Sequence, residues 1–226
     1  LHGARRAAVP RRRGRGPGDV GLITVKGLSC LEKADVIIYD YLLNERLMES
    51  ARPEVERIYV GKTVSYHIKK QREINQLLVE KAKEGKIVVR LKGGDPFVLG
   101  RGGEEAEALA QAHIPFEVVP GISSAIAVPA YAGIPVTHRR LSSSLTIITG
   151  HEDASKGRSS VAWEKLATGA DTLIFLMGVG NLSQIVRQLL NNGCAPTTPI
   201  ALIKNGTGPR QETIVDSLAD IVAKAE

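Results

Sequence analysis

Short apolar runs alternate with polar stretches along the first half of the chain, in the pattern typical of buried strands joined by helices. Four runs are expected to form strands: Val36–Tyr39, Ile58–Val60, Ile87–Val89 and Phe116–Val119. A helix is predicted between the second and third runs, where apolar residues recur at helical spacing: Ile74, Leu77, Leu78 and Ala82. Gly85 stands where its C-cap belongs, and another helix is expected over residues 104–112. Such alternation indicates βαβ units and a mainly parallel sheet.

The second half of the chain repeats this pattern after a segment of different composition. From Pro120 to Arg140, prolines, glycines and small residues predict a short helix followed by a linker. Three further strands are then expected, at Leu145–Ile148, Leu173–Leu176 and Ile200–Ile203. Helices are expected near Leu182–Asn191, ended by Gly193, and over Leu218–Ala225. We therefore predict two α/β domains, residues 16–138 and 139–226, and a site in the cleft between them, because pockets favour domain interfaces.

Composition narrows the class of protein. The chain has 226 residues, of which 43% are hydrophobic, and no apolar run in the sequence is long enough to span a bilayer. The start is rich in arginine but lacks the apolar core of a secretory signal. Cys30 and Cys194 have no metal-ligand spacing. We expect a reduced, cytoplasmic protein without membrane partners.

The formal charge of +6 comes from the start of the chain. Six arginines and no acid stand in residues 1–15; without them, 24 basic residues face 24 acidic ones. A neutral body argues against a broad nucleic-acid surface. We expect residues 1–15 to be a disordered or artefactual extension.

One glycine-rich segment carries the strongest candidate chemistry. Five glycines follow the expected strand Ile87–Val89, between Arg90 and Glu105, and let backbone groups approach a ligand. Asp95, Arg101 and Glu104 supply charge beside them. The end of a parallel strand is where open α/β proteins bind ligands.

Other candidate motifs are weaker. The segment from Gly14 to Asp19 fails as a dinucleotide motif, because Asp19 replaces the third glycine and charges precede it. Asp40 and Lys62 follow neighbouring expected strands, so they form either a general acid–base pair or a structural ion pair. No third ligand joins His138 and His151 at metal spacing, so no metal is assigned.

Taken together, eleven motifs in register resemble the tetrapyrrole methylases that depend on S-adenosylmethionine, in the uroporphyrinogen-III C-methyltransferase branch. They are Gly14–Asp19, Asp40, Gly61-Lys62, Gly93–Val98, Gly100–Glu105, Val119–Ser123, Ala130–Pro135, Thr137–Arg139, Thr149–His151, Met177-Gly178 and Asn205–Thr207. The resemblance runs from about Gly14 to the end. The segment from Gly93 to Glu105 separates this branch from other tetrapyrrole methylases and from related ribosomal-RNA methylases.

The resemblance implies two α/β domains with S-adenosylmethionine in the cleft between them, and a homodimer. It implies methylation of uroporphyrinogen III at C2 and C7, by way of precorrin-1 to precorrin-2, for sirohaem and cobalamin synthesis. Two alternatives remain: a ribosomal-RNA methylase of the same architecture, supported by the arginine-rich start, and a relative that binds the cofactor without turnover. The second is motivated by the arginines that stand where the family has its first strand.

The resemblance also assigns roles to residues. By position, the cofactor would be held by Pro17, Gly93, Gly94, Asp95, Val98, Ser123, Ser124, Met177 and Gly206. Asp40 would be the proton acceptor and Lys62 the proton donor. Three residues would lie against the substrate: Arg101, which is also a candidate catalytic residue, Glu104 and Arg139. The family's usual Thr-Ala pair is Ser123-Ser124 here, which keeps the first hydroxyl.

Overall fold

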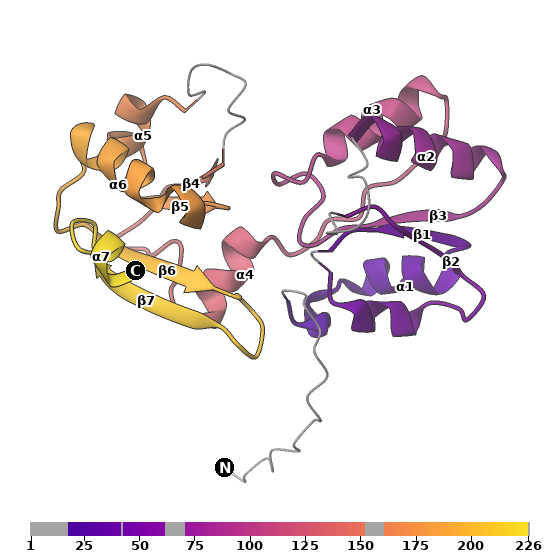
Figure 1. Ribbon diagram of the computed structural model, residues 1–226, viewed down its shortest axis with the longest axis horizontal. Helices are drawn as coiled ribbons and strands as arrows, with labels where there is room; N and C mark the ends of the chain where they lie inside the picture. Colours follow the sequence, from indigo (N-terminus) through magenta and orange to yellow (C-terminus); the bar gives the residue numbers. More distant parts are fainter. Residues whose placement is uncertain (1–17, 42, 62–70, 152–160, 226) are drawn as a thin grey trace, which may run out of the picture.

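The computed structural model describes residues 18–41, 43–61, 71–151 and 161–225. Within these ranges the chain forms two groups of strands and helices, with the helix α4 (Ser124–Tyr131) lying between them (Figure 1). Residues 18–111 form one group and residues 145–225 the other. The two-part α/β architecture predicted from the sequence is therefore present.

The first group is built on a three-stranded parallel sheet in the order β2-β1-β3. Its strands are β1 (Val36–Tyr39), β2 (Glu56–Tyr59) and β3 (Val88–Leu91). β1 is central and buried on both faces, because Val36, Ile37 and Ile38 are each fully buried. A continuous apolar run suits such a strand, since helices cover both faces of a parallel sheet.

Helices cover each face of this sheet (Figure 1). Ile37 packs on one face with α1 (Val25–Lys33) and the 3₁₀ helix η2 (Glu45–Ser50). On the other face Val36 and Ile38 pack against α2 (Gln71–Lys83), and α3 (Gly102–Gln111) adds Leu109. Gly85 follows α2 with φ +76°, as its predicted position at the C-cap requires.

The connection to the second group corrects one expectation. Residues 116–119 were expected to form a strand, but residues 112–123 contain no regular element, and Phe116 is 46% exposed. Pro115 and Pro120 flank the run and carry no backbone N–H for a ladder, which explains why an apolar run forms no strand here.

The second group contains two small sheets. β4 (Leu145–Thr149) pairs in parallel with β5 (Thr172–Leu176), whereas β6 (Pro199–Lys204) and β7 (Glu212–Ser217) form an antiparallel pair. The accompanying helices are α5 (Trp163–Gly169), η4 (Val179–Asn181), α6 (Leu182–Asn191) and α7 (Ile221–Ala225). Their core joins Ile185, Val186 and Leu189 of α6 to Leu218 and Ile221.

Three features of this group differ from the sequence expectations, and the first is that the helix α5 was not predicted. The strand β7 was missed, because only two of its residues, Ile214 and Val215, are apolar and the strand is only partly buried, which gives a weak signal. The last helix was expected from Leu218 but begins at Ile221, since Leu218 is buried in the connection that precedes it. In the ranges that the structure describes, no helix has the length and apolar character needed to cross a membrane.

Candidate active site

A large cavity lies between the two groups and draws its walls from both. Its volume is about 2420 Å³, which exceeds the roughly 300–1,000 Å³ of pockets that hold one drug-sized ligand. Among its lining residues are Gly93, Gly94 and Val98 after β3, Ser124 on α4, and Met177 after β5. The cavity also branches toward α2, so its full volume exceeds that of the cleft itself.

The glycine-rich loop between β3 and α3 forms one wall. Gly94 has φ +80°, a conformation that glycine adopts without strain. A Cβ at Gly102 would stand 2.5 Å from the carbonyl oxygen of Pro96, and one at Gly100 would stand 2.7 Å from it. The loop can fold back on itself only because these positions carry no side chain.

Asp95 fixes this loop from within. Its Oδ1 accepts a hydrogen bond from the backbone N–H of Phe97 (2.8 Å) and its Oδ2 accepts one from the N–H of Gly121 (3.0 Å). A Cβ at Gly121 would collide with the carbonyl group of Gly94. Asp95 therefore ties the glycine-rich loop to the segment that leads into α4, and it is absent from the lining that the described residues form.

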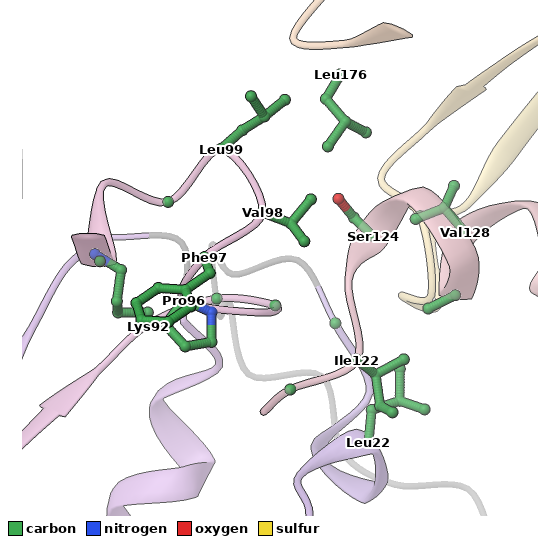
Figure 2. A pocket seen from close by; sticks show the side chains of 18 of the residues that line it. Leu22, Lys92, Pro96, Phe97, Val98, Leu99, Ile122, Ser124, Val128 and Leu176 are labelled. Atoms are coloured by element: carbon green, nitrogen blue, oxygen red, sulfur yellow. The ribbon is translucent and has the colours of Figure 1, made fainter. Parts of the chain in front are cut away.

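Apolar side chains from three elements face the cleft. Figure 2 shows Val98 and Leu99 of the loop opposite Leu176 at the end of β5 and Ser124 and Val128 of α4. Below them, Ile122 lies beside Leu22. Bare backbone next to apolar walls suits an organic ligand with both polar and apolar parts.

The helix α4 is placed by capping and by a close contact. The Ser123 hydroxyl caps α4 by accepting a hydrogen bond from the N–H of Ala125 (3.2 Å), while Ser124 faces the cavity. At Gly206, after β6, a Cβ would collide with the side chain of Val128. Gly206 therefore allows α4 to approach the turn after β6.

Left-handed backbone conformations gather around the cavity. Of the six described non-glycine residues with positive φ, five line it: Leu99, Arg101, Met177, Asn205 and Thr207. Such conformations are uncommon outside glycine and are concentrated at functional sites. The sequence gives no signal for them, because none of these residue types marks a positive φ reliably.

A cluster of charges lies where β1, β3 and α3 meet. The Arg90 guanidinium contacts Asp40 Oδ2 (3.1 Å) and Glu105 Oε1 (3.1 Å), and Lys92 Nζ lies 3.2 Å from both Glu105 oxygens. Glu105 is 5% exposed. Burial lowers the pKa of the Lys92 ammonium, and the neighbouring Arg90 guanidinium lowers it further.

This cluster modifies the prediction for Asp40. The sequence placed Asp40 at the carboxyl edge of the sheet, and it does follow β1 there and line the cavity. Its contact with Arg90 was not anticipated. A charged residue inside the strand Val88–Leu91 was the available signal, because an unpaired charge does not belong in a buried strand.

The predicted substrate residues are more exposed. Arg101 and Glu104 form a two-bonded ion pair with both distances at 2.7 Å, which raises the pKa of Arg101 and lowers that of Glu104. Arg101 lines the cavity, whereas Glu104 is not part of the lining formed by the described residues. Arg139 is exposed in the turn closed by the His138–Ser142 bridge and is also outside that lining.

Two predicted residues, Pro17 and Lys62, lie outside the described residues. Of the other residues predicted to hold the cofactor, six come together around the cavity: Gly93, Gly94, Val98, Ser124, Met177 and Gly206. Asp95 and Ser123 shape its loops. Over the described ranges, no group of three or more His, Cys, Asp or Glu residues is arranged to hold a metal ion.

Known proteins are similar to this chain in sequence and in architecture. The family model for Tetrapyrrole (Corrin/Porphyrin) Methylases matches residues 14–222. A Methanocaldococcus jannaschii protein named uroporphyrinogen-III C-methyltransferase is 54% identical over 214 residues, 94% of this chain and 88% of that protein. Siroheme synthase 2 of Serratia proteamaculans is 49% identical over 208 residues, 92% of this chain and 44% of that protein.

A solved structure of a related enzyme has a similar fold. Uroporphyrin-III C-methyl transferase from Thermus thermophilus, complexed with S-adenyl homocysteine, superposes with a TM-score of 0.79 at 37% identity, covering 94% of this chain and 90% of that one. The family match extends over both groups of elements and includes every residue of the glycine-rich loop. This chain therefore belongs to the tetrapyrrole methylase family.

Proposed function

We propose that this chain methylates uroporphyrinogen III at C2 and C7, with S-adenosylmethionine as methyl donor, to give precorrin-2 by way of precorrin-1. The observation that carries the proposal is the cleft itself: the glycine-rich loop that distinguishes this branch forms one of its walls. Relatives about half identical to this chain over nearly all of its length are named for this reaction.

The cleft fits the methyl donor. Gly93 and Gly94 present bare backbone to the cavity, Val98 and Leu176 offer apolar contacts, and Ser124 provides a hydroxyl (Figure 2). When bound, S-adenosylmethionine supplies an activated methyl group on a sulfonium, so no protein nucleophile is needed. The residues of this chain then have to hold an electron-rich pyrrole carbon in line with that methyl group, and such positioning can contribute about 7–11 kcal/mol.

A proton must leave after each transfer. Methylation leaves positive charge on the tetrapyrrole, and its loss as a proton requires an acceptor. We assign that role to Asp40, which lines the cavity at the carboxyl end of β1. Lys62 remains the proposed proton donor, and it lies outside the described residues.

The charges around the cavity support a polyanionic substrate. Uroporphyrinogen III carries eight carboxylates, and arginine forks match carboxylate geometry. Basic side chains among the described lining residues are Lys26, Lys33, Lys86, Arg90, Lys92, Arg101 and Arg210, and they outnumber the acidic ones, which are Asp19, Asp40, Glu105, Glu117 and Asp171. We propose that Arg101, Glu104 and Arg139 contact the substrate.

The wider setting follows from the same proposal. The name of the relative Siroheme synthase 2 supports a place for this chain in sirohaem synthesis, and precorrin-2 is also a precursor for cobalamin.

We propose a cytoplasmic location, supported by the two free cysteines Cys30 and Cys194. We also propose a homodimer, supported by exposed apolar side chains along and before α4.

Transfer of a radiolabelled methyl group tests the choice of acceptor. Labelled S-adenosylmethionine is offered with uroporphyrinogen III, with another precorrin, and with ribosomal RNA in separate reactions. We expect label in uroporphyrinogen III. Label confined to another precorrin would overturn the substrate, label confined to RNA would favour the RNA methylase, and cofactor binding without any transfer would favour the inactive relative.

A further inference from the structure

The buried carboxylate of Glu105 has no role in the proposed reaction, yet it lies at the centre of the charge cluster. We propose that Glu105 is a positioning residue: it holds the Arg90 guanidinium, which in turn holds the carboxylate of Asp40. This inference rests on the proposed function, in which Asp40 accepts the proton. Glu105 is among the residues that line the cavity, but only 5% of it is exposed, so we assign it no contact with substrate or cofactor.

Glu105 is fixed on α3 by three different donors. Its Oε1 accepts hydrogen bonds from Arg90 Nε (3.1 Å), Lys92 Nζ (3.2 Å) and Gln71 Nε2 (3.2 Å). Its side chain is 6% exposed, and those of Arg90 and Lys92 are 12% and 11% exposed. A carboxylate with this many partners, so little of it exposed, has a single defined position.

Arg90 connects Glu105 to Asp40 and so fixes the position of the Asp40 carboxylate. While Nε contacts Glu105, one terminal nitrogen contacts Asp40 Oδ2 at 3.1 Å. The other donates to the carbonyl oxygens of Leu91 (2.8 Å) and Ile38 (3.3 Å). Because the guanidinium is planar and rigid, fixing one edge fixes the direction of the other.

The charge balance supports the same link. Arg90 and Lys92 bring two positive charges into a mostly buried place, and Glu105 offsets one of them. Asp40 supplies the second negative charge through Arg90. Burial and the neighbouring Arg90 lower the pKa of Lys92, as expected where cations lie close together in a mostly buried place. Neutralising Glu105 leaves two cations competing for Asp40 and for backbone carbonyls.

A double-mutant cycle separates positioning from general stability. We expect Glu105→Gln to lower the single-turnover rate of methyl transfer by roughly 10- to 100-fold, the size of effect that a small misplacement of a reacting group produces. The dissociation constant for S-adenosylhomocysteine should stay nearly unchanged. In a chain that already carries Asp40→Ala, Glu105→Gln should lower the single-turnover rate little further, because the effect of Glu105 is exerted through Asp40.

Glu107→Gln is the matched control, since Glu107 lies exposed on the same helix two residues away. It should leave rate and binding unchanged. The proposal would be overturned if Glu105→Gln lowered the single-turnover rate by the same factor in the wild type and in the Asp40→Ala variant. It would also be overturned if Glu105→Gln left the wild-type rate unchanged. If Glu105→Gln does not fold, Arg90→Lys takes its place in the cycle, because lysine lacks the fork that holds both carboxylates.

A crystal structure of Glu105→Gln gives a readout that needs no turnover. We expect the Arg90 guanidinium to shift from its wild-type position and the Asp40 carboxylate to move with it, and unchanged positions of both groups would overturn the proposal. If the wild-type chain transfers no methyl group to uroporphyrinogen III, the proposed function fails, and this structure still decides whether Glu105 positions Asp40.

Discussion

Single residues of the candidate active site act in two physical ways. Charged side chains such as Asp40 are held by buried partners, and glycines such as Gly206 let two elements approach more closely than a Cβ allows. Both kinds were predicted as site residues, but the sequence could not show their partners. Arg90 and Val128 come from distant parts of the chain, and contacts of that kind are set by the fold.

Asp40→Ala tests the proposed proton acceptor. We expect turnover to fall by about 10²- to 10⁴-fold, the usual contribution of a positioned acid or base. Affinity for S-adenosylhomocysteine, measured by calorimetry, should be nearly unchanged, because Asp40 lies at the carboxyl end of β1 rather than in the glycine-rich loop. An equal loss of turnover and cofactor affinity would instead mark a structural role.

Gly206→Ala tests the close contact with α4. The added methyl group would collide with Val128, so we expect a loss of about 1–3 kcal/mol in the free energy of unfolding. Val128→Ala in the same chain makes room and should recover part of the loss. Denaturant unfolding measures both.

Gly169→Ala is the control for this pair, because a Cβ at Gly169 meets nothing within 4 Å. It should unfold like the wild type. If Gly206→Ala costs no more than Gly169→Ala, the contact does not constrain α4.

At the scale of elements, periodicity predicted most strands and helices of the described chain. Strands β1, β4 and β6 and helices α2 and α6 follow strong apolar patterns, and each forms close to its expected range. Two exceptions have local causes, because prolines flank residues 116–119 and β7 is only partly buried. The helices α1 and α5 were also not predicted. The positive-φ turns that surround the cavity were unpredictable, since their conformation depends on tertiary contacts.

Asp171 joins the starts of β4 and β5 and gives a prediction at this scale. Its Oδ2 accepts hydrogen bonds from the backbone N–H groups of Ser143 (2.8 Å) and Ser144 (3.0 Å) and from both hydroxyls. These bonds, the one from Ser143 N–H first, lower the pKa of Asp171. A carboxyl whose pKa is lower in the folded state stabilises the fold above its unfolded pKa of about 4.

That stabilisation is lost as the pH falls through the lower, folded pKa. We therefore expect Asp171→Asn to reduce the urea midpoint at pH 7, and the difference from wild type to shrink once the pH falls below about 4. Urea titrations of both chains from pH 7 to pH 3 measure it. A difference that stays constant over this range would show that the charge of Asp171 does not contribute.

At the scale of the whole molecule, the two groups of elements enclose one large cavity, and exposed apolar side chains lie near it. Ile126 and Tyr131 lie on α4 outside the cavity lining formed by the described residues, and each is more than 40% exposed. Exposed apolar patches of this kind mark interaction surfaces. The fold class and cleft could be predicted from the sequence because the motifs recur in register, whereas the surface proposed to pair two chains has no such motif.

Sedimentation tests the proposed homodimer. We expect a species of twice the 24.3 kDa chain mass at micromolar concentration. Ile126→Glu should shift this species toward the monomer, because a charge would be buried in the interface. Val215→Glu is the control, since Val215 is exposed on β7, away from α4, and it should leave the sedimenting species unchanged. A wild-type chain that sediments as a monomer would contradict the dimer.

The central claim is the reaction itself, and anaerobic turnover of uroporphyrinogen III with S-adenosylmethionine tests it most directly. The mass of the tetrapyrrole product is measured by mass spectrometry. The proposed function predicts the gain of two methyl groups, with a singly methylated species appearing first. A folded chain that binds S-adenosylhomocysteine and leaves the mass of uroporphyrinogen III unchanged would contradict it.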